Sequence, residues 1–116
     1  MQQKIITNGD MSLTLHSLVM DLGAIETGSI QAIYTGAPTG SLYLELSDQI
    51  IGPSADPNTA VTQWSVYSSS AQAISAAGDF LFNISNMGYK WLRLTYVPSG
   101  GTGSLNATAN VKGTNV

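Results

Sequence analysis

The chain contains no cysteine and only one histidine. No disulfide can therefore hold the fold together, and the several His or Cys ligands of a zinc site are missing. The 116 residues suffice for one domain around a single hydrophobic core. We expect one domain over residues 1–116, with residues 1–10 as an N-terminal arm or short strand and residues 113–116 as a frayed tail.

Charge is scarce in this chain. Only 9% of the residues are Asp, Glu, Lys or Arg, against about 25% in ordinary soluble domains. Four basic residues in a chain of net charge −3 make nucleic-acid binding improbable, because that affinity comes mostly from phosphate neutralisation. Two interpretations stay open. Either neutral polar residues simply provide solubility, or the surface is built to pack against copies of itself or a larger assembly.

Long apolar runs are also missing. Met1–Lys4 leads into only two isoleucines, so we expect no secretory signal, and no run approaches the length of a membrane span. We therefore expect a protein that does not enter membranes. It would stay where it is made, or leave by lysis or through a dedicated machine.

Strict alternation of apolar and polar residues is the main pattern that is present. In Lys90–Tyr96, Leu92, Leu94 and Tyr96 point to one face and Trp91, Arg93 and Thr95 to the other, which predicts a half-buried strand. Residues 104–112 alternate in the same way after the turn-rich segment 98–103. We predict a terminal hairpin. Its expected inner face consists of Leu92, Leu94, Leu105, Ala107, Ala109 and Val111.

Similar runs recur along the rest of the chain. Segments 29–35 and 41–47 flank the reversal Gly36–Gly40 and predict a second hairpin. Turn signals recur every 8–12 residues or so, and no segment shows sustained helical periodicity. The pattern predicts an all-β fold, an antiparallel β-sandwich of jelly-roll type with eight or nine strands. The other expected strands lie at 11–15, 18–22, 63–67, 73–75 and 79–85, with a turn at 8–10 and a long irregular stretch at 48–62.

Residues with catalytic chemistry form no recognisable motif. His16 could in principle work with Asp10 or Asp21, but no nucleophile elbow accompanies it, and an outward-facing strand histidine is the better interpretation. Asp48 and Asp56 flank the long loop and are weak candidates for calcium ligands. Aspartates that cap loops explain the same two residues without a metal. We expect no enzyme activity and no cofactor.

Arg93 and the aromatic residues are the candidate binding residues. Arg93 could stack on a tryptophan or pair with Glu45 or Asp79, or it could form a purely structural ion pair. Exposed aromatic rings stack on sugars and also anchor protein interfaces, and the sequence fits both uses. The candidate aromatics are Tyr43, Trp64, Tyr67, Tyr89 and Trp91.

Part of the chain resembles the discoidin-type galactose-binding jelly roll. The resemblance is carried by Leu44–Asp48, Trp64, Tyr89–Leu94 and a last strand that ends at Lys112–Gly113. In that family a strand with Ser-Asp precedes a tryptophan strand, and an aromatic-x-Arg strand precedes the last one. The resemblance implies the jelly-roll fold. This chain departs from the family in being shorter and in lacking the disulfide that many members have.

A second resemblance extends from Ser12 onward and is carried by Gln31–Ser47, the Trp64 strand, Gly78–Asn83 and Tyr89–Leu105. In these segments the chain is similar to small all-β structural proteins of bacterial viruses. This resemblance implies a capsid decoration protein, a head fibre or a tail-associated module.

These observations lead to two functional expectations from different classes. The first is a non-enzymatic virion protein, made in the host cytoplasm without a signal peptide and displayed on the virion surface. It would form a homo-oligomer, with a trimer favoured, and would bind a major capsid or tail protein. The alternative is a carbohydrate-binding or cell-surface-adhesion module that uses Trp64, Tyr67 and Trp91 to stack on a surface glycan.

Overall fold

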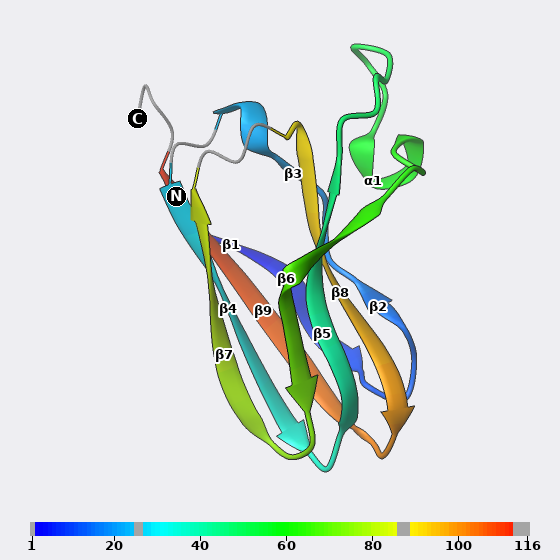
Figure 1. Ribbon diagram of the computed structural model, residues 1–116, viewed down its shortest axis with the longest axis vertical. Helices are drawn as coiled ribbons and strands as arrows, with labels where there is room; N and C mark the ends of the chain where they lie inside the picture. The colour runs from blue at the N-terminus through cyan, green and yellow to red at the C-terminus, as the bar shows by residue number, and fades with distance from the viewer. Residues whose placement is uncertain (1, 25–26, 86–88, 113–116) are drawn as a thin grey trace.

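The structure, a computed structural model, describes residues 2–24, 27–85 and 89–112, and most of them lie in β-strands (Figure 1). No helix in this part of the chain is long and apolar enough to cross a membrane. The elements are β1 (Gln2–Asp10), β2 (Leu15–His16), β3 (Met20–Asp21), the 3₁₀ helix η1 (Leu22–Ala24), β4 (Thr27–Gly36), β5 (Thr39–Ser47), α1 (Pro57–Ala60), β6 (Ser65–Ile74), β7 (Gly78–Ser85), β8 (Trp91–Gly100) and β9 (Gly103–Lys112).

Two antiparallel sheets face each other (Figure 1). The four-stranded sheet has the order β1-β9-β4-β7, and the five-stranded sheet has the order β2-β8-β5-β6 with β3 also paired to β8. If β2 and β3 are counted as one interrupted strand, this is the strand order of a jelly roll. The prediction of an all-β antiparallel sandwich of this type is confirmed.

The core lies between the sheets and consists of the apolar faces of the alternating strands. The central strands of the four-stranded sheet contribute the small residues Ala32, Ala107 and Ala109 together with the larger Ile30, Tyr34 and Leu105. The central strands of the other sheet contribute only large residues, and combining large and small residues across a core favours close packing. The large residues on β5 and β8 are Leu42, Leu44, Leu46, Leu92, Leu94 and Tyr96.

Both predicted hairpins are wrong. β4 and β5 lie in different sheets, and so do β8 and β9. The inner face predicted for 92–111 is nevertheless apolar and turned inward, because each strand packs its apolar side on the same core. A short turn between two alternating strands can close a hairpin or carry the chain across to the opposite sheet. Local sequence does not distinguish these two outcomes.

Two of the corners where the chain crosses between the sheets pack against each other. The Ala37 amide donates to the Thr102 carbonyl at 2.8 Å. Gly101, with a φ of +73°, has no room for a side chain, because a Cβ would lie 2.0 Å from the Ala37 oxygen. A Cβ on Gly103 would lie 2.2 Å from the Thr35 oxygen. The glycines predicted to make a hairpin turn therefore allow backbone-to-backbone contact between the two corners.

Other expected elements also differ from the structure. Residues 2–10 form β1 and pair with β9, so the strand alternative for the N-terminus is correct, and the arm and the turn at 8–10 are wrong. Asn8 adopts a φ of +49° within this irregular strand, and the chain reverses at 11–13. The two short strands expected around 63–75 are one strand, β6. The tail expected at 113–116 lies outside the described residues.

Tyr96 is fully buried, and its hydroxyl oxygen has no hydrogen-bond partner in the described part of the chain. The hydroxyl lies under the backbone of Gly40, where a Cβ would lie 2.7 Å from it. Burial raises the pKa of this phenol. A buried polar group without a partner carries its full desolvation cost.

We therefore expect Tyr96→Phe to raise the free energy of unfolding by about 1 kcal/mol, because the lost hydroxyl makes no bond. Urea unfolding would show a higher midpoint at an unchanged m-value. Tyr34→Phe is the matched control. The Tyr34 hydroxyl donates to the Asp79 carbonyl at 3.4 Å, so its removal should bring no gain. A loss of stability in Tyr96→Phe would instead indicate a partner for the hydroxyl, such as a buried water.

Candidate functional site

A cluster of polar side chains, two of them buried, lies on the outer face of the five-stranded sheet. Glu45 on β5 pairs in register with Arg93 on β8, and Thr95 on β8 pairs with His16 on β2. These side chains alternate with the leucines of the core and therefore point away from it. Together with Trp64 they form what we term the Glu45 cluster: His16, Glu45, Trp64, Arg93 and Thr95.

Glu45 is the centre of the cluster. It is only 9% exposed, and its Oε1 accepts hydrogen bonds from Arg93 Nε at 2.9 Å and from the Thr95 hydroxyl. A carboxylate this far from water needs such partners. The Arg93 guanidinium also stacks on Trp64, with 4.4 Å between its central carbon and the ring centroid. Both expected contacts of Arg93, the tryptophan stack and the Glu45 pair, are present. Asp79 lies on β7 in the opposite sheet.

The same hydrogen bonds determine which ring nitrogen of neutral His16 carries the proton. The Thr95 hydroxyl gives its only hydrogen to Glu45, so it must accept the bond that joins it to His16 Nδ1 at 3.0 Å. His16 Nδ1 is therefore the protonated nitrogen of the neutral ring. Burial lowers the pKa of His16, the Arg93 charge lowers it further, and the Glu45 charge opposes both effects.

The loop between β5 and β6, residues 48–64, folds back over this face. The Trp64 indole donates to the Val61 carbonyl at 3.1 Å, and the Trp91 indole donates to the Gln49 carbonyl at 3.0 Å. The Gln49 side chain accepts from the amides of Thr62 and Gln63 and so holds the end of the loop. These bonds hold the loop and the two tryptophans against the five-stranded sheet, at the end where β8 begins.

Asp48 and Asp56, the candidate calcium ligands, each accept a hydrogen bond from a backbone amide. Asp56 is the N-cap of α1 and accepts from the Asn58 amide at 3.0 Å, so the capping interpretation is confirmed for this residue. Asp48 accepts from the Lys90 amide at 2.9 Å. Within the described residues, no group of three or more His, Cys, Asp or Glu side chains lies close enough together to hold a metal ion.

The candidate aromatics do not form one platform. Trp91 is 8% exposed, and the ring of Trp64 is covered by Arg93. Tyr43 is half-buried beside the Glu45 cluster, where burial and the Glu45 charge raise its pKa. Tyr67 and Tyr89 are the exposed ones, at 37% and 44%. They line different hollows.

One hollow lies at the end of the sandwich where the loop begins. Tyr89 and Ile50 contribute exposed apolar surface, and Asp48, Gln63 and Ser65 contribute polar groups. A ring beside carboxylate, amide and hydroxyl groups suits a small polar ligand. Trp64, Tyr67 and Trp91, the residues expected to stack on a sugar, do not line this hollow. Of the five aromatic candidates, only Tyr89 does.

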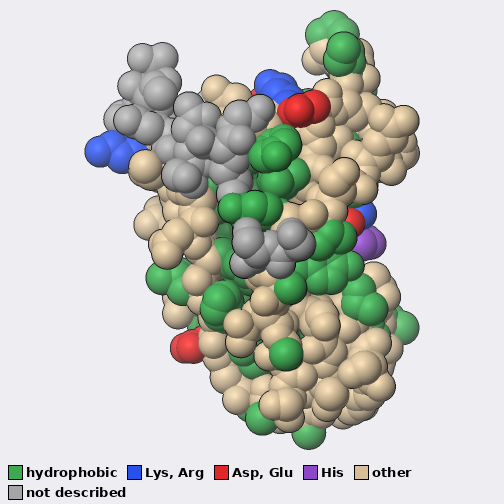
Figure 2. Space-filling model, viewed as in Figure 1, with side chains coloured by type: hydrophobic (Ala, Val, Ile, Leu, Met, Phe, Trp, Pro, Cys, Tyr) green, Lys and Arg blue, Asp and Glu red, His purple; other side chains and the backbone are tan. Residues whose placement is uncertain are grey.

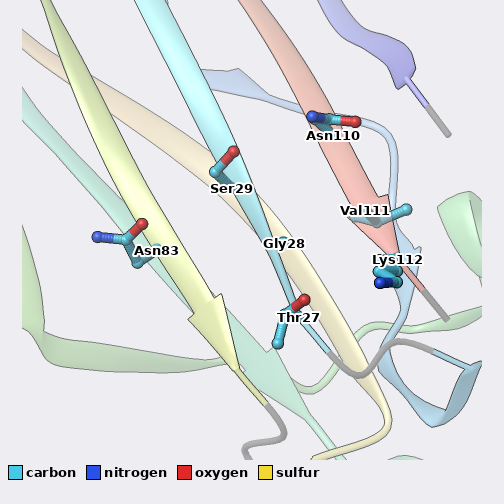
Figure 3. Close-up of a pocket in the computed structure, with 7 residues that line it drawn as sticks. All are labelled: Thr27, Gly28, Ser29, Asn83, Asn110, Val111 and Lys112. Carbon is cyan, nitrogen blue, oxygen red and sulfur yellow. The ribbon is translucent and has the colours of Figure 1, made fainter. Parts of the chain in front are cut away.

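A second surface, which the sequence did not single out, is the outer face of the four-stranded sheet. A shallow groove crosses it, and its lining comes from β4, β7 and β9 (Figure 3). In register, Ser29 lies between Asn83 and Asn110. The outward residues of this sheet, which we term the neutral face, are Gln2, Lys4, Asp10, Thr27, Ser29, Gln31, Ile33, Thr35, Asp79, Leu81, Asn83, Ser104, Asn106, Thr108, Asn110 and Lys112.

Apolar side chains also reach the surface between the edges of the two sheets. A cleft there is lined by Leu44 and Tyr67 from one sheet and by Phe80 and Leu81 from the other. Figure 2 shows apolar atoms along this side of the molecule, between the strands β6 and β7 of Figure 1. The alternation of β6 and β7 was visible in the sequence, but the meeting of their edges depends on the topology.

No protein-family model matches the chain, and no curated protein matches it significantly. The fold and the surfaces described above therefore carry the functional argument.

The Glu45–Arg93 pair should contribute to stability far more than the exposed pair Lys90–Asp21. Arg93→Met removes the guanidinium from a buried carboxylate and should lower the free energy of unfolding by about 3 kcal/mol. Lys90→Met should cost less than about 1 kcal/mol, because both partners are nearly half exposed. Adding Glu45→Gln to Arg93→Met should restore part of the loss. Equal effects of the two single variants would show that the cluster is not buried in solution.

His16 should make stability depend on pH. Its pKa is lowered from 6.5 in the folded chain, so the unfolded chain binds the proton more readily. The free energy of unfolding should therefore be fully retained above 6.5 and fall as the pH drops below it. His16→Asn keeps a donor near Thr95 but does not titrate. Urea midpoints between about pH 7.5 and about pH 5 should fall more in the wild type than in this variant. Parallel curves would contradict the assignment.

Proposed function

We propose that the protein is a non-enzymatic structural component of a virion, displayed on the capsid or tail of a bacterial virus as a homo-oligomer. The observation that carries this proposal is the neutral face, a broad sheet surface of the jelly roll whose charged residues lie at its margins and whose middle is uncharged. Jelly rolls are a frequent architecture of viral capsid domains and also of lectins. Because a fold does not define a function, the proposal rests on the properties of the face.

The neutral face suits contact with other protein surfaces. Its charged residues are Lys4, Asp10, Asp79 and Lys112, which lie on the two edge strands or at the end of β9 and leave the middle of the face uncharged. Ile33 and Leu81 add apolar surface at 48% and 52% exposure. The cores of protein interfaces are depleted in charge, because neutral amides and hydroxyls are easier to desolvate than ions. Many copies bound side by side turn modest single contacts into strong attachment.

The Glu45 cluster supports a structural rather than a catalytic assignment. Its carboxylate is engaged by Arg93 and Thr95, and the Thr95 hydroxyl is almost fully buried. A nucleophile must be accessible to its substrate, and a general base needs a free lone pair near it. The Thr95 hydroxyl is too buried to act as a nucleophile, and Oε1 of Glu45 is already hydrogen-bonded and so is not a free base. The cluster instead fastens loop 48–64 to the sheet.

The alternative function, glycan binding, is supported by the hollow at Tyr89. An exposed ring next to Asp48, Gln63 and Ser65 offers stacking and hydrogen bonding to a sugar. This hollow lies at the end of the sandwich and is distinct from the neutral face. Substitutions can therefore separate the two functions.

The test is to purify virus particles from lysates of the organism that encodes the chain. We expect the chain among the particle proteins, and added labelled protein should co-sediment with particles stripped of it. Ile33→Lys places a charge in the middle of the neutral face and should weaken co-sedimentation by about tenfold or more. Tyr89→Ala should leave it unchanged.

Three results would count against the proposal. The chain could be missing from purified particles, or the labelled protein could stay in the supernatant. The third is a reversed pattern, in which Tyr89→Ala abolishes binding and Ile33→Lys does not. A glycan array with wild-type protein and Tyr89→Ala would then show whether the hollow binds sugar.

A further inference from the structure

The edges of the two sheets are not equally regular. β1 carries Lys4 and has two register shifts against β9. The edge of the five-stranded sheet opposite β6 is split into β2 and β3. Between them, the Ser17 hydroxyl accepts a hydrogen bond from the Leu94 amide. The pairing of β6 with β5 shifts between Leu42 and Leu44, and the Ser70 side chain bonds the Leu44 amide there. Bulges, breaks and lysines are the devices that keep edge strands from pairing with other chains.

β7 has none of these devices. It pairs with β4 residue for residue from Gly78 to Ser85 without a register shift. It contains no proline or lysine, and its one charged residue is Asp79. In the described part of the chain β7 is the last strand of its sheet, so the backbone groups on its far side have no strand partner. Three edges are blocked, and this one is open to pairing.

We propose that β7 pairs antiparallel with β7 of a second copy of this chain, about a two-fold axis that places Leu81 opposite the partner's Leu81. The two four-stranded sheets would then form one continuous sheet. The backbone hydrogen bonds supply the attraction, as in other cases of strand addition to a sheet edge.

The side chains of β7 fit a second copy in this register. On the neutral face, Asp79 lies opposite the partner's Asn83, so an acid meets an amide and no like charges are opposed. Leu81, 52% exposed in the single chain, meets its own copy. On the inner side Phe80 lies opposite the partner's Phe82. A two-fold contact must be self-complementary, and each of these pairs occurs twice or lies on the axis.

The contact would also cover the apolar cleft beside β7. Phe80 and Leu81 line that cleft together with Tyr67 from the opposite sheet. A strand added to β7 lies along the rim of the cleft and removes apolar surface from water, at about 25 cal/mol per Å². The inference deepens the proposed function, because it names a dimer as the unit that assembles. It replaces the trimer expected from the sequence, since a two-fold contact gives even numbers.

Cross-linking provides the first test, because the chain has no cysteine of its own. Leu81→Cys should form a disulfide-linked dimer under mild oxidation, since directly opposed strand residues lie within disulfide range. Ile33→Cys is the matched control. It has similar exposure on the same face, but it lies on a central strand and should stay monomeric on denaturing gels. Equal cross-linking of both variants would point to face-to-face stacking and overturn the inference.

Light scattering over a concentration series provides the second test. The wild type should show a dimer, and Leu81→Lys should weaken dimerisation by about 100-fold, because two ammonium groups meet at the axis. Ile33→Lys should leave the dimer unchanged. A monomeric wild type at every concentration, or a Leu81→Lys dimer as stable as the wild type, would overturn the inference.

These results are separable from those on virus particles. A monomer that co-sediments with particles would leave the proposed function standing and remove the β7 contact. A dimer sensitive to Leu81→Lys but absent from particles would do the reverse.

Discussion

The fold depends on the contact between two corners where the chain crosses from one sheet to the other. The amide of Ala37 bonds the carbonyl of Thr102, and Gly101 and Gly103 let the two backbones touch. This contact holds β4 and β9 side by side in one sheet and leads β5 and β8 into the other. The apolar faces of all four strands then meet in a single core. A side chain at either glycine would force the corners apart, so the small size of these residues is a condition of the topology.

The jelly roll leaves its two outer faces in different states. On the five-stranded sheet, the Glu45 cluster and the tryptophans fasten loop 48–64, and Trp91 and Thr95 lose nearly all contact with water. The four-stranded sheet has no such cover among the described residues and exposes amides, hydroxyls and two aliphatic side chains. Four of the charged residues form the pairs Glu45–Arg93 and Asp21–Lys90, away from the neutral face. The charged residues of the neutral face lie on its edge strands or at the end of β9, so the middle of that face is uncharged.

The proposed contacts divide the surface by physical type. The neutral face offers side chains that are easily desolvated, and the β7 edge offers backbone groups that require a strand partner. The two surfaces share Leu81 and meet at β7. A dimer formed through β7 would present two neutral faces in one continuous sheet, which doubles the area available to a larger particle. The hollow at Tyr89 lies apart from both and belongs to the glycan-binding alternative.

Much of the fold could be predicted from the sequence, and much of the candidate site could not. The alternation of residues 90–96 and 104–112 determined which side chains face the core, because side chains along a strand alternate between its two faces. The turn residues located most of the reversals, and the pairing of Arg93 with Glu45 was one of the expected options. Which strands share a sheet was decided by tertiary structure alone, because a turn can close a hairpin or cross the core with the same residues. The open β7 edge, the cleft beside it and the cover over Trp91 all follow from that choice of partners, so they exist only once strands distant in sequence are placed together.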